Sequence, residues 1–198
     1  FPYTTLFRSN FQMSGLRWKE QFSPWTGGKL VAGVDYDQTS GDVKYERVAP
    51  APRGTFDTPT FRITSPYVAL SQQVPLNQDW ALLPSAALRF YDSNQFESKT
   101  APLAGLSLVS DKLTVFANVS RGISYPGLET TVLSNLIKPL GKSWEQLSAE
   151  ELDHVEIGVK FSPTSATQID ASIFNDKVKN RYVFGFPPAV PPPPQFIN

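Results

Sequence analysis

The side chains best suited to acid–base chemistry in this sequence are His154 and the carboxylates near it. His154 is the only histidine, and Glu156 follows two residues later. A histidine beside a carboxylate can act as a general base or a metal ligand, but either role needs a nucleophile or further ligands placed with it. The pair Glu150–Glu151 offers no acid–base couple, because adjacent residues of a strand point to opposite faces. We interpret these residues as polar side chains of a strand and predict that the chain is not an enzyme.

Metal and cofactor chemistry has little support in the sequence. Asp35, Asp37 and Asp42 resemble part of a calcium loop, but they lack the ligand spacing of an EF-hand. The absence of cysteine removes disulfides, thiolate metal sites and cysteine nucleophiles together. Neither a Gly-rich phosphate loop nor a G-x-S-x-G motif occurs. We predict no metal site and no cofactor, so the remaining chemistry is that of binding.

Segments of alternating polarity must position any binding residues. Leu152–Phe161 is the clearest of them: one set of alternate residues is Val155, Ile157, Val159 and Phe161, and the other is His154, Glu156, Gly158 and Lys160. Leu113–Ser120 alternates in the same way. A period of two over this length predicts β-strands with one apolar and one polar face.

Eight segments of this kind can be recognised along the chain. The predicted strands are Asn10–Phe22, Lys29–Asp37, Phe61–Leu76 (with a break at Pro66), Trp80–Tyr91, Thr100–Val109, Leu113–Ile123, Leu152–Phe161 and Thr167–Phe184. Short turns at 23–28, 77–79, 110–112 and 162–166 alternate with longer connections.

The two longest connections carry some structure of their own. Gln38–Thr60 is polar and rich in Pro, Gly and Asp, and it predicts a loop with a possible strand extension at Val43–Val48. In Ser124–Glu150, Ser143 and Gln146 have the spacing of a capping box. That spacing predicts a short helix near Trp144–Glu151.

Together these elements predict an all-β fold. About eight antiparallel strands in up-and-down order, with short turns at one end and long loops at the other, are typical of a transmembrane β-barrel wall. Trp25 and Trp80 fall beside the short turns, where an aromatic girdle belongs. If these strands are part of a larger barrel, they form an open, curved sheet whose edges are Asn10–Phe22 and Thr167–Phe184.

Composition narrows the function classes. The 198 residues suffice for one domain, and the formal net charge of zero gives no basic footprint for nucleic acid. Charged residues make up 18% and aromatic residues 13%, which is low in charge for a soluble domain. No run of eighteen apolar residues exists, which excludes a helical membrane span.

The first nine and the last twelve residues of the chain do not have the alternating pattern of the predicted strands. Phe1–Ser9 reads FPYTTLFRS, which matches the in-frame translation of a common short-read sequencing adaptor. We interpret residues 1–9 as an artefact and expect the natural frame to begin upstream. Residues 187–198 contain PPAVPPPP, which predicts a Pro-rich, truncated loop.

Three stretches resemble the TonB-dependent outer-membrane receptor family. Leu113–Glu129, LTVFANVSRGISYPGLE, is similar to an aromatic-rich strand followed by Ser-x-Gly and a Pro. Leu147–Lys160, LSAEELDHVEIGVK, resembles an L-x-P-E…E-x-G-x-K strand opening, with Ala149 in place of the Pro. Trp80–Tyr91 resembles a strand ending in Gly-Leu-Arg-aromatic, with Ala87 in place of the Gly.

The resemblance implies that residues 10–186 are part of a barrel of about twenty-two strands whose lumen holds a plug. It implies a bacterial outer-membrane location, contact with lipid and lipopolysaccharide, and uptake driven by the TonB complex through a plug outside this chain. The commonest ligand of the family is a ferric siderophore, so iron would be present only within a transported chelate. A receptor for vitamin B12, haem or an oligosaccharide would show the same sequence features. A non-TonB porin or channel and a soluble β-sandwich binding module stay open as alternatives.

Candidate ligand-binding residues follow from the chemistry of siderophores. Arginine supplies charge and planar hydrogen bonding to anionic chelates, and aromatic rings stack on flat groups. The candidates near the long-loop ends are Tyr45, Arg47, Arg62, Tyr91, Arg121, Tyr125, Trp144, Arg181 and Tyr182. The same residue types also serve at a membrane interface or in pairs with nearby acids.

Overall fold

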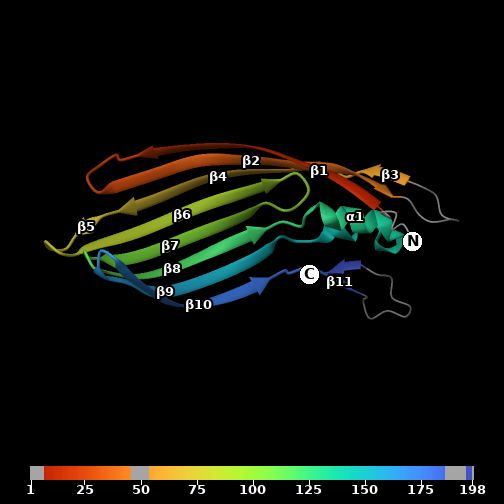
Figure 1. Ribbon diagram of the computed structural model, residues 1–198. Helices are drawn as coiled ribbons and strands as arrows, with labels where there is room; N and C mark the ends of the chain where they lie inside the picture. The colour runs from red at the N-terminus through yellow and green to blue at the C-terminus, as the bar shows by residue number, and fades with distance from the viewer. Residues whose placement is uncertain (1–6, 46–53, 186–194, 198) are drawn as a thin grey trace.

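One antiparallel sheet contains most of the chain (Figure 1). The computed structural model describes residues 7–45, 54–185 and 195–197. Neighbouring strands follow the order β1-β2-β4-β6-β7-β8-β9-β10, with β3 paired to β2 and β5 paired to β6. These strands are β1 Phe7–Phe22, β2 Gly28–Tyr45, β3 Gly54–Asp57, β4 Phe61–Gln72, β5 Val74–Pro75, β6 Ala81–Ser93, β7 Lys99–Val109, β8 Leu113–Ser124, β9 Glu150–Thr164 and β10 Thr167–Lys179.

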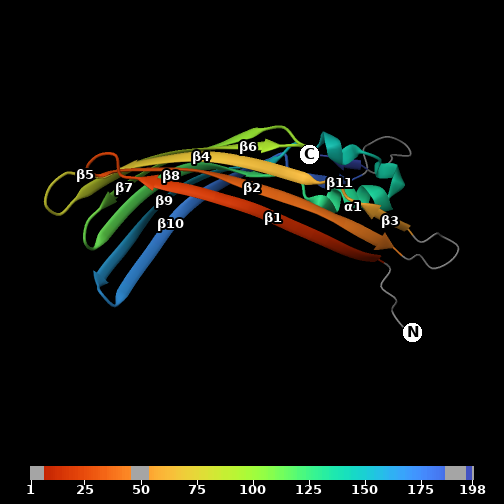
Figure 2. The ribbon, with the colours of Figure 1, turned by 90° about the horizontal axis from the view of Figure 1, so that it is seen from above.

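The remaining elements gather at one end of the sheet. They are α1 Leu128–Leu136, the 3-10 helices η1 Lys138–Leu140 and η2 Ser143–Gln146, and the pair β11 Val183–Gly185 and β12 Gln195–Ile197. The views in Figures 1 and 2 place α1, β3 and β11 at this end, which we call the long-loop end, and β5 at the other. None of the helices in the described ranges is long and apolar enough to span a membrane.

The prediction of an open up-and-down sheet is confirmed. The strands follow one another in chain order along the sheet, and β1 and β10 are its two edges. Figure 2 shows that the sheet is curved. The apolar side chains are not covered by a second sheet, because Val119, Val155 and Ile173 are all exposed. This arrangement is the opposite of a β-sandwich, in which such side chains form the core.

The strand register lines up apolar residues from β1 to β9. One row of directly opposed residues crosses all eight main strands: Phe22, Leu30, Leu70, Ala86, Ala104, Val119, Val155 and Asn175. The row begins next to the short turn after β1 and ends toward the long-loop end of β9 and β10. The strands are therefore staggered along the sheet, as strand tilt in a barrel requires. We call the side that carries this row the apolar face.

The opposite side, the polar face, carries the alternate rows. Two of them are Asn118–Glu156–Phe174 and Ser120–His154–Asp176. Their members on β8 and β9 are half-buried, whereas Val119 and Val155 on the apolar face are exposed. The apolar side chains thus lie on the exposed side of the sheet, whereas the polar side chains are partly covered by one another.

Several predicted strand ends are wrong. The predicted loop Gln38–Thr60 begins too early, because β2 continues to Tyr45 and pairs with both β1 and β3. Within the possible extension at Val43–Val48, residues 46–48 lie outside the described residues. The polar residues of this stretch favour a loop locally, but ladder hydrogen bonds on two sides override that preference.

The third and eighth predicted strands are also too long. The third ends at Gln72, and Pro66 interrupts only the β4–β6 pairing, since proline has no N–H to donate. The eighth ends at Lys179 and not at Phe184, because Asn180 takes a left-handed backbone conformation with φ of 56°. The last short turn is reduced to residues 165–166, because β9 extends to Thr164.

The helical prediction is only partly correct. A 3-10 helix forms at Ser143–Gln146, but Leu147 leaves it in an extended conformation and β9 begins at Glu150. The longer helix α1 was not expected from the sequence. It carries three successive β-branched residues, Thr130, Thr131 and Val132, and Gly127 gives no side-chain cap. Tertiary packing therefore accounts for α1 better than local propensity does.

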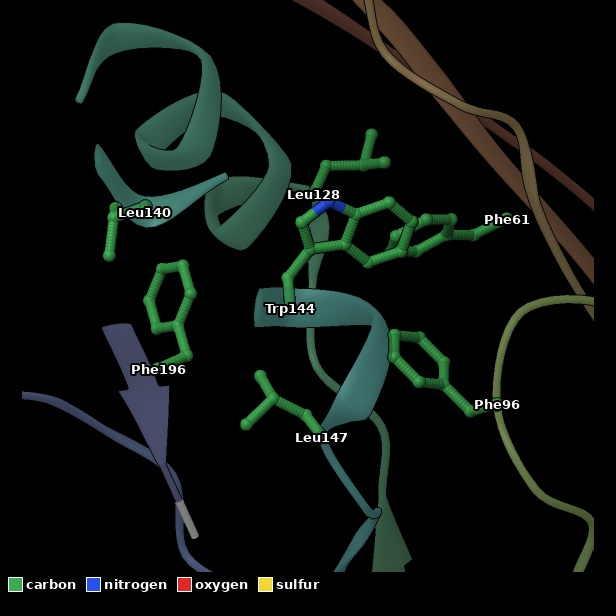
Figure 3. Close-up of a cluster of buried hydrophobic side chains, with 7 residues drawn as sticks. All are labelled: Phe61, Phe96, Leu128, Leu140, Trp144, Leu147 and Phe196. Atoms are coloured by element: carbon green, nitrogen blue, oxygen red, sulfur yellow. The ribbon is translucent and has the colours of Figure 1, made fainter. Parts of the chain in front are cut away.

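A small hydrophobic core holds the long-loop end together (Figure 3). Trp144 of η2 is at its centre, between Phe61 of β4 and the β6–β7 connection. The members are Phe61, Phe96, Leu128, Leu140, Trp144, Leu147 and Phe196. Four separate parts of the chain thus meet in one cluster, which fixes the loops relative to the sheet.

Residues 1–9 and 187–198 are described only in part. Phe7–Ser9 form the start of β1 and pair with Val43–Tyr45 of β2. Residues 195–197 form β12, which pairs with β11. The interpretation of residues 1–9 as an artefact and the domain boundaries stay predictions.

Candidate functional site

The polar face of β8, β9 and β10 carries a connected hydrogen-bond network. His154 Nδ1 lies 2.6 Å from Asp176 Oδ1, and its Nε2 lies 3.7 Å from Glu156 Oε2. Asn118 donates to Glu156 at 3.2 Å, and the Phe174 ring stacks on the imidazole. The histidine is thus held between two carboxylates, one of which, Glu156, is also hydrogen-bonded to Ser172. These side chains form a polar network on one face of three neighbouring strands.

A second network lies on β1, β2 and β6. Asp35 is 8% exposed and accepts a hydrogen bond from Arg89 at 2.6 Å, with Arg17 Nε 3.6 Å away. Arg17 also donates to Asp37 at 2.6 Å. The Arg89 guanidinium lies over the ring of Tyr91 at 5.0 Å from its centroid. Two aspartates and two arginines therefore neutralise one another across three strands.

The β8–β9 connection reaches across the sheet at the long-loop end. Helix α1 lies against β2, with β4, β6 and β7 between β8 and β2 in the sheet order (Figure 1). Tyr125 donates to the carbonyl of Glu97 at 2.8 Å and stacks on Phe96. The connection is therefore anchored on the β6–β7 connection as well as on its own strands.

A further pair of contacts ties the C-terminal strands to this connection. The Tyr182 hydroxyl donates to Glu129 Oε1 of α1 at 2.5 Å, and the Phe196 backbone N–H donates to Ser143 Oγ at 3.1 Å. The ring of Tyr182 contacts that of Phe196. Burial and the neighbouring carboxylates raise the pKa of Tyr182 to about 12, with Glu129 the closest of them. Burial likewise raises the pKa of Tyr125 to about 12.

The predicted ligand-binding residues fall into distinct environments. Trp144 is 8% exposed within the hydrophobic core, and Tyr125 and Tyr182 make the loop contacts described above. Tyr91 packs against Arg89, and Arg181 is exposed beside β11. Arg47 and the side chain of Tyr45 lie outside the described residues. The structure therefore brings Tyr91, Tyr125 and Trp144 into one aromatic cluster but gives them structural partners.

Two of the predicted arginines share the register of the apolar face. Arg62 is opposite Gln38 and donates to its side chain at 3.2 Å. Arg121 is opposite Asp153 and donates to it at 2.7 Å, two residues beyond the apolar row of Val119 and Val155. On this face, both arginines lie nearer the long-loop end than the apolar row does, where charged and polar side chains replace apolar ones.

Reasoning from the sequence missed the Asp35–Arg89 pair and the role of Phe61 and Phe96 in the core. Each of these contacts joins residues that are far apart in the sequence, so no local spacing indicates it. The one available signal was an isolated polar residue in an apolar segment, as Arg89 is among Leu82–Phe90. Among the described residues, no group of three or more potential metal ligands lies together.

A profile of the family described as "TonB dependent receptor-like, beta-barrel" matches residues 2–198. No curated protein is detectably similar in sequence.

Solved structures of similar fold support the architecture. The siderophore receptor PirA from Pseudomonas aeruginosa superposes with a TM-score of 0.64 at 18% identity, covering 96% of this chain and 37% of that one. The copper transporter OprC gives 0.65 at 13% identity, covering 97% and 33%. PirA from Acinetobacter baumannii gives 0.59 at 14% identity, covering 90% and 28%. The chain thus spans about a third of the length of these proteins.

Proposed function

Since the chain belongs to the family of TonB-dependent receptor β-barrels, we propose that it forms part of the wall of an outer-membrane receptor for active uptake of a scarce ligand. The observation that carries this proposal is the row of directly opposed residues across the eight main strands, which is apolar on seven of them, backed by polar rows on the other face. A barrel wall in a membrane has this distribution of polarity, with lipid outside and a polar lumen inside.

In this orientation the apolar face contacts lipid and the polar face lines the lumen. From Phe161 to Val155 the apolar side chains of β9 span about 20 Å along the strand, which fits within the roughly 25 Å height of a lipid-facing band. The short turns face the periplasm, and the long-loop end, with its hydrophobic core, faces the outside. The networks around His154 and Asp35 then lie in the lumen.

The proposed ligand is a ferric siderophore, with iron carried only inside the chelate. Two of the structural neighbours are siderophore receptors and one is a copper transporter. A protein site for copper uses Met, Cys or His ligands, and this chain contains one Met, one His and no Cys. Arg181 is exposed at the long-loop end, where it can meet an anionic chelate. These features favour a chelate over a bare copper ion.

Active uptake by a receptor of this family requires coupling to the TonB complex. A passive porin lacks that coupling, so energy dependence separates the two functions. The test uses a strain deleted for the gene that contains this chain and the same strain with the gene restored. The expected result is energy-dependent uptake of a ferric hydroxamate or catecholate chelate only in the restored strain, abolished by a protonophore.

Two results would contradict the proposal. Uptake that continues after the protonophore would indicate a passive channel. Recovery of the protein in the soluble fraction would indicate a soluble binding module. Radiolabelled copper, supplied in parallel without chelator, serves as the control for ligand class.

A further inference from the structure

Two neighbouring turns enclose a pocket at the short-turn end of the sheet. The β5–β6 turn, residues 76–80, and the β7–β8 turn, residues 110–112, lie side by side because Ala81 is directly opposite Val109. Figure 1 places this end of the sheet opposite to α1. The pocket between the turns has a volume of about 310 Å³, at the lower end of the range for small-molecule sites.

Both turns are held by hydrogen bonds of their own. In the first, Asn77 Oδ1 accepts from the backbone N–H groups of Asp79 and Trp80, each at 2.9 Å. In the second, the backbone N–H of Ser110 donates to the carbonyl of Leu113 at 2.7 Å. The side chains that line the pocket therefore project from an ordered backbone, and binding costs little additional ordering.

The pocket combines one aromatic ring with amide and carboxylate groups. Trp80 is half-buried and lines the pocket together with Gln73, Gln78, Asp79 and Asp111. The side chains of Gln78, Asp79 and Asp111 are exposed and make no hydrogen bond or ion pair with any other described residue. Their polar atoms are therefore available to a ligand that lies against the indole.

The chemistry of the lining favours an uncharged ligand with many hydroxyl and amide groups. Within the described ranges, no Lys, Arg or His lines the pocket, so its two carboxylates would repel an anion. Carboxylates accept hydrogen bonds from hydroxyl groups, and glutamine amides both donate and accept. The C–H face of a sugar ring can pack on an indole, which offers a large, rigid apolar surface. A cationic segment would use the carboxylates and the ring, but it would leave the amides without a role.

We propose that this pocket binds an N-acetylated glycan strand of the kind that forms the bacterial cell wall. One sugar ring packs on Trp80, and its hydroxyl and acetamido groups bind Gln78, Asp79 and Asp111. The inference rests on the membrane orientation proposed above, in which the short turns face the periplasm, the compartment that contains the cell wall. Binding at this pocket would tether the barrel to the cell wall beneath the membrane.

The test measures sedimentation of the protein with insoluble cell-wall sacculi. The protein that contains this chain is purified in detergent and mixed with sacculi that have been freed of protein and lipid. We expect the protein to sediment with the sacculi, and a soluble N-acetylglucosamine oligomer to displace it. Polylysine, a probe for a cation site, should not displace it.

Variants of the lining separate the aromatic contact from the polar contacts. Trp80→Ala removes the ring and should weaken binding about tenfold, whereas Trp80→Tyr should keep most of the affinity. Gln78→Ala and Asp111→Ala change exposed turn residues, so the fold tolerates them, and each should weaken binding about fivefold. Lys112→Ala is the matched control, because Lys112 is exposed in the same turn but does not line the pocket.

The outcomes distinguish this inference from the proposed function. If a carbonate wash leaves the protein in the membrane fraction but Gln78→Ala and Asp111→Ala sediment as well as the unmodified protein, only the glycan site is refuted. The same holds if the unmodified protein does not sediment with the sacculi. Displacement by polylysine but not by the oligosaccharide would also refute it, in favour of a site for a basic segment. If the carbonate wash releases the protein, the membrane orientation fails and the inference fails with it.

Discussion

The ring of Phe116 in β8 covers the backbone of Gly158 in β9, its directly opposed partner on the polar face. A Cβ atom at position 158 would lie 2.5 Å from Phe116 Cζ and 2.9 Å from Ser172 Cβ. The space that a side chain would need is therefore already occupied from both neighbouring strands. Such aromatic–glycine pairs also fix strand register, because a shift of the pairing would remove the ring from the glycine.

Gly158→Ala is expected to destabilise the sheet for this reason. The added methyl group must displace the Phe116 ring, at a cost of about 1–3 kcal/mol. The measurement is the free energy of unfolding in urea, with the protein that contains this chain inserted in phospholipid vesicles. Gly122→Ala is the matched control, since a Cβ there meets only Leu152 Cβ at 3.7 Å. Equal stability of the two variants would show that the ring is free to move aside.

Trp144→Ala should loosen the long-loop end without unfolding the sheet. Trp144 contacts Phe61 and Phe96 in the hydrophobic core, and removing a buried aromatic side chain of this size costs about 3–5 kcal/mol. Hydrogen exchange should accelerate over residues 128–147 while β8 and β9 keep their protection. Leu133→Ala, at an exposed position of α1, serves as the control. Faster exchange in the strands as well would mean that the loops and the sheet unfold together.

Tyr182→Phe should release β11 and β12 from α1. The hydroxyl donates to the Glu129 carboxylate, and a hydrogen bond to a charged group contributes about 1.5–3 kcal/mol. We expect faster hydrogen exchange at residues 183–185 and unchanged exchange in β10. Glu145→Gln alters another exposed carboxylate of the same connection and should have no such effect. Unchanged exchange in Tyr182→Phe would show that the hydrogen bond does not hold the strands.

Alkaline pH should weaken the same loop contacts. The pKa values of Tyr125 and Tyr182 are raised from 10.0 to about 12, so folding favours their protonated forms. This stabilisation is fully present below pH 10 and is lost as the pH rises through 12. Exchange at residues 183–185, corrected for its intrinsic pH dependence, should therefore accelerate over that interval. The pH dependence of this exchange should be smaller in Tyr182→Phe. A transition well below pH 10 would show that groups other than these two tyrosines cause the acceleration.

Asp35→Asn tests the network on the polar face of β2. The substitution leaves the guanidinium of Arg89 without its charged partner at 2.6 Å. Because the Arg89 side chain is about one-third exposed, we expect a loss of about 2 kcal/mol, below the cost for a fully buried pair. Urea unfolding measures this loss. The double variant Asp35→Asn/Arg89→Met should recover part of it, and a purely additive result would show that the two residues do not interact.

The sequence alone was sufficient for the fold class and for most of the strands. Alternation in Leu152–Phe161 assigned each residue to a face, because successive side chains of a strand point to opposite sides. Short turns near Trp25 and Trp80 and long connections between them indicated the up-and-down order. These features are local, so they can be recognised without knowledge of the neighbouring strands.

Only the tertiary structure decided the register, the loop core and α1. A period of two fixes the face of Arg121 but not its partner, so the row of Arg121, Asp153 and Lys177 appears only once the strands are paired. The contact of Trp144 with Phe61 joins distant parts of the chain, and α1 is held by such contacts more than by its own residues. The candidate sites depend on these non-local pairings, and the physical reason is that pairing and packing energies act between strands and loops, not along one segment.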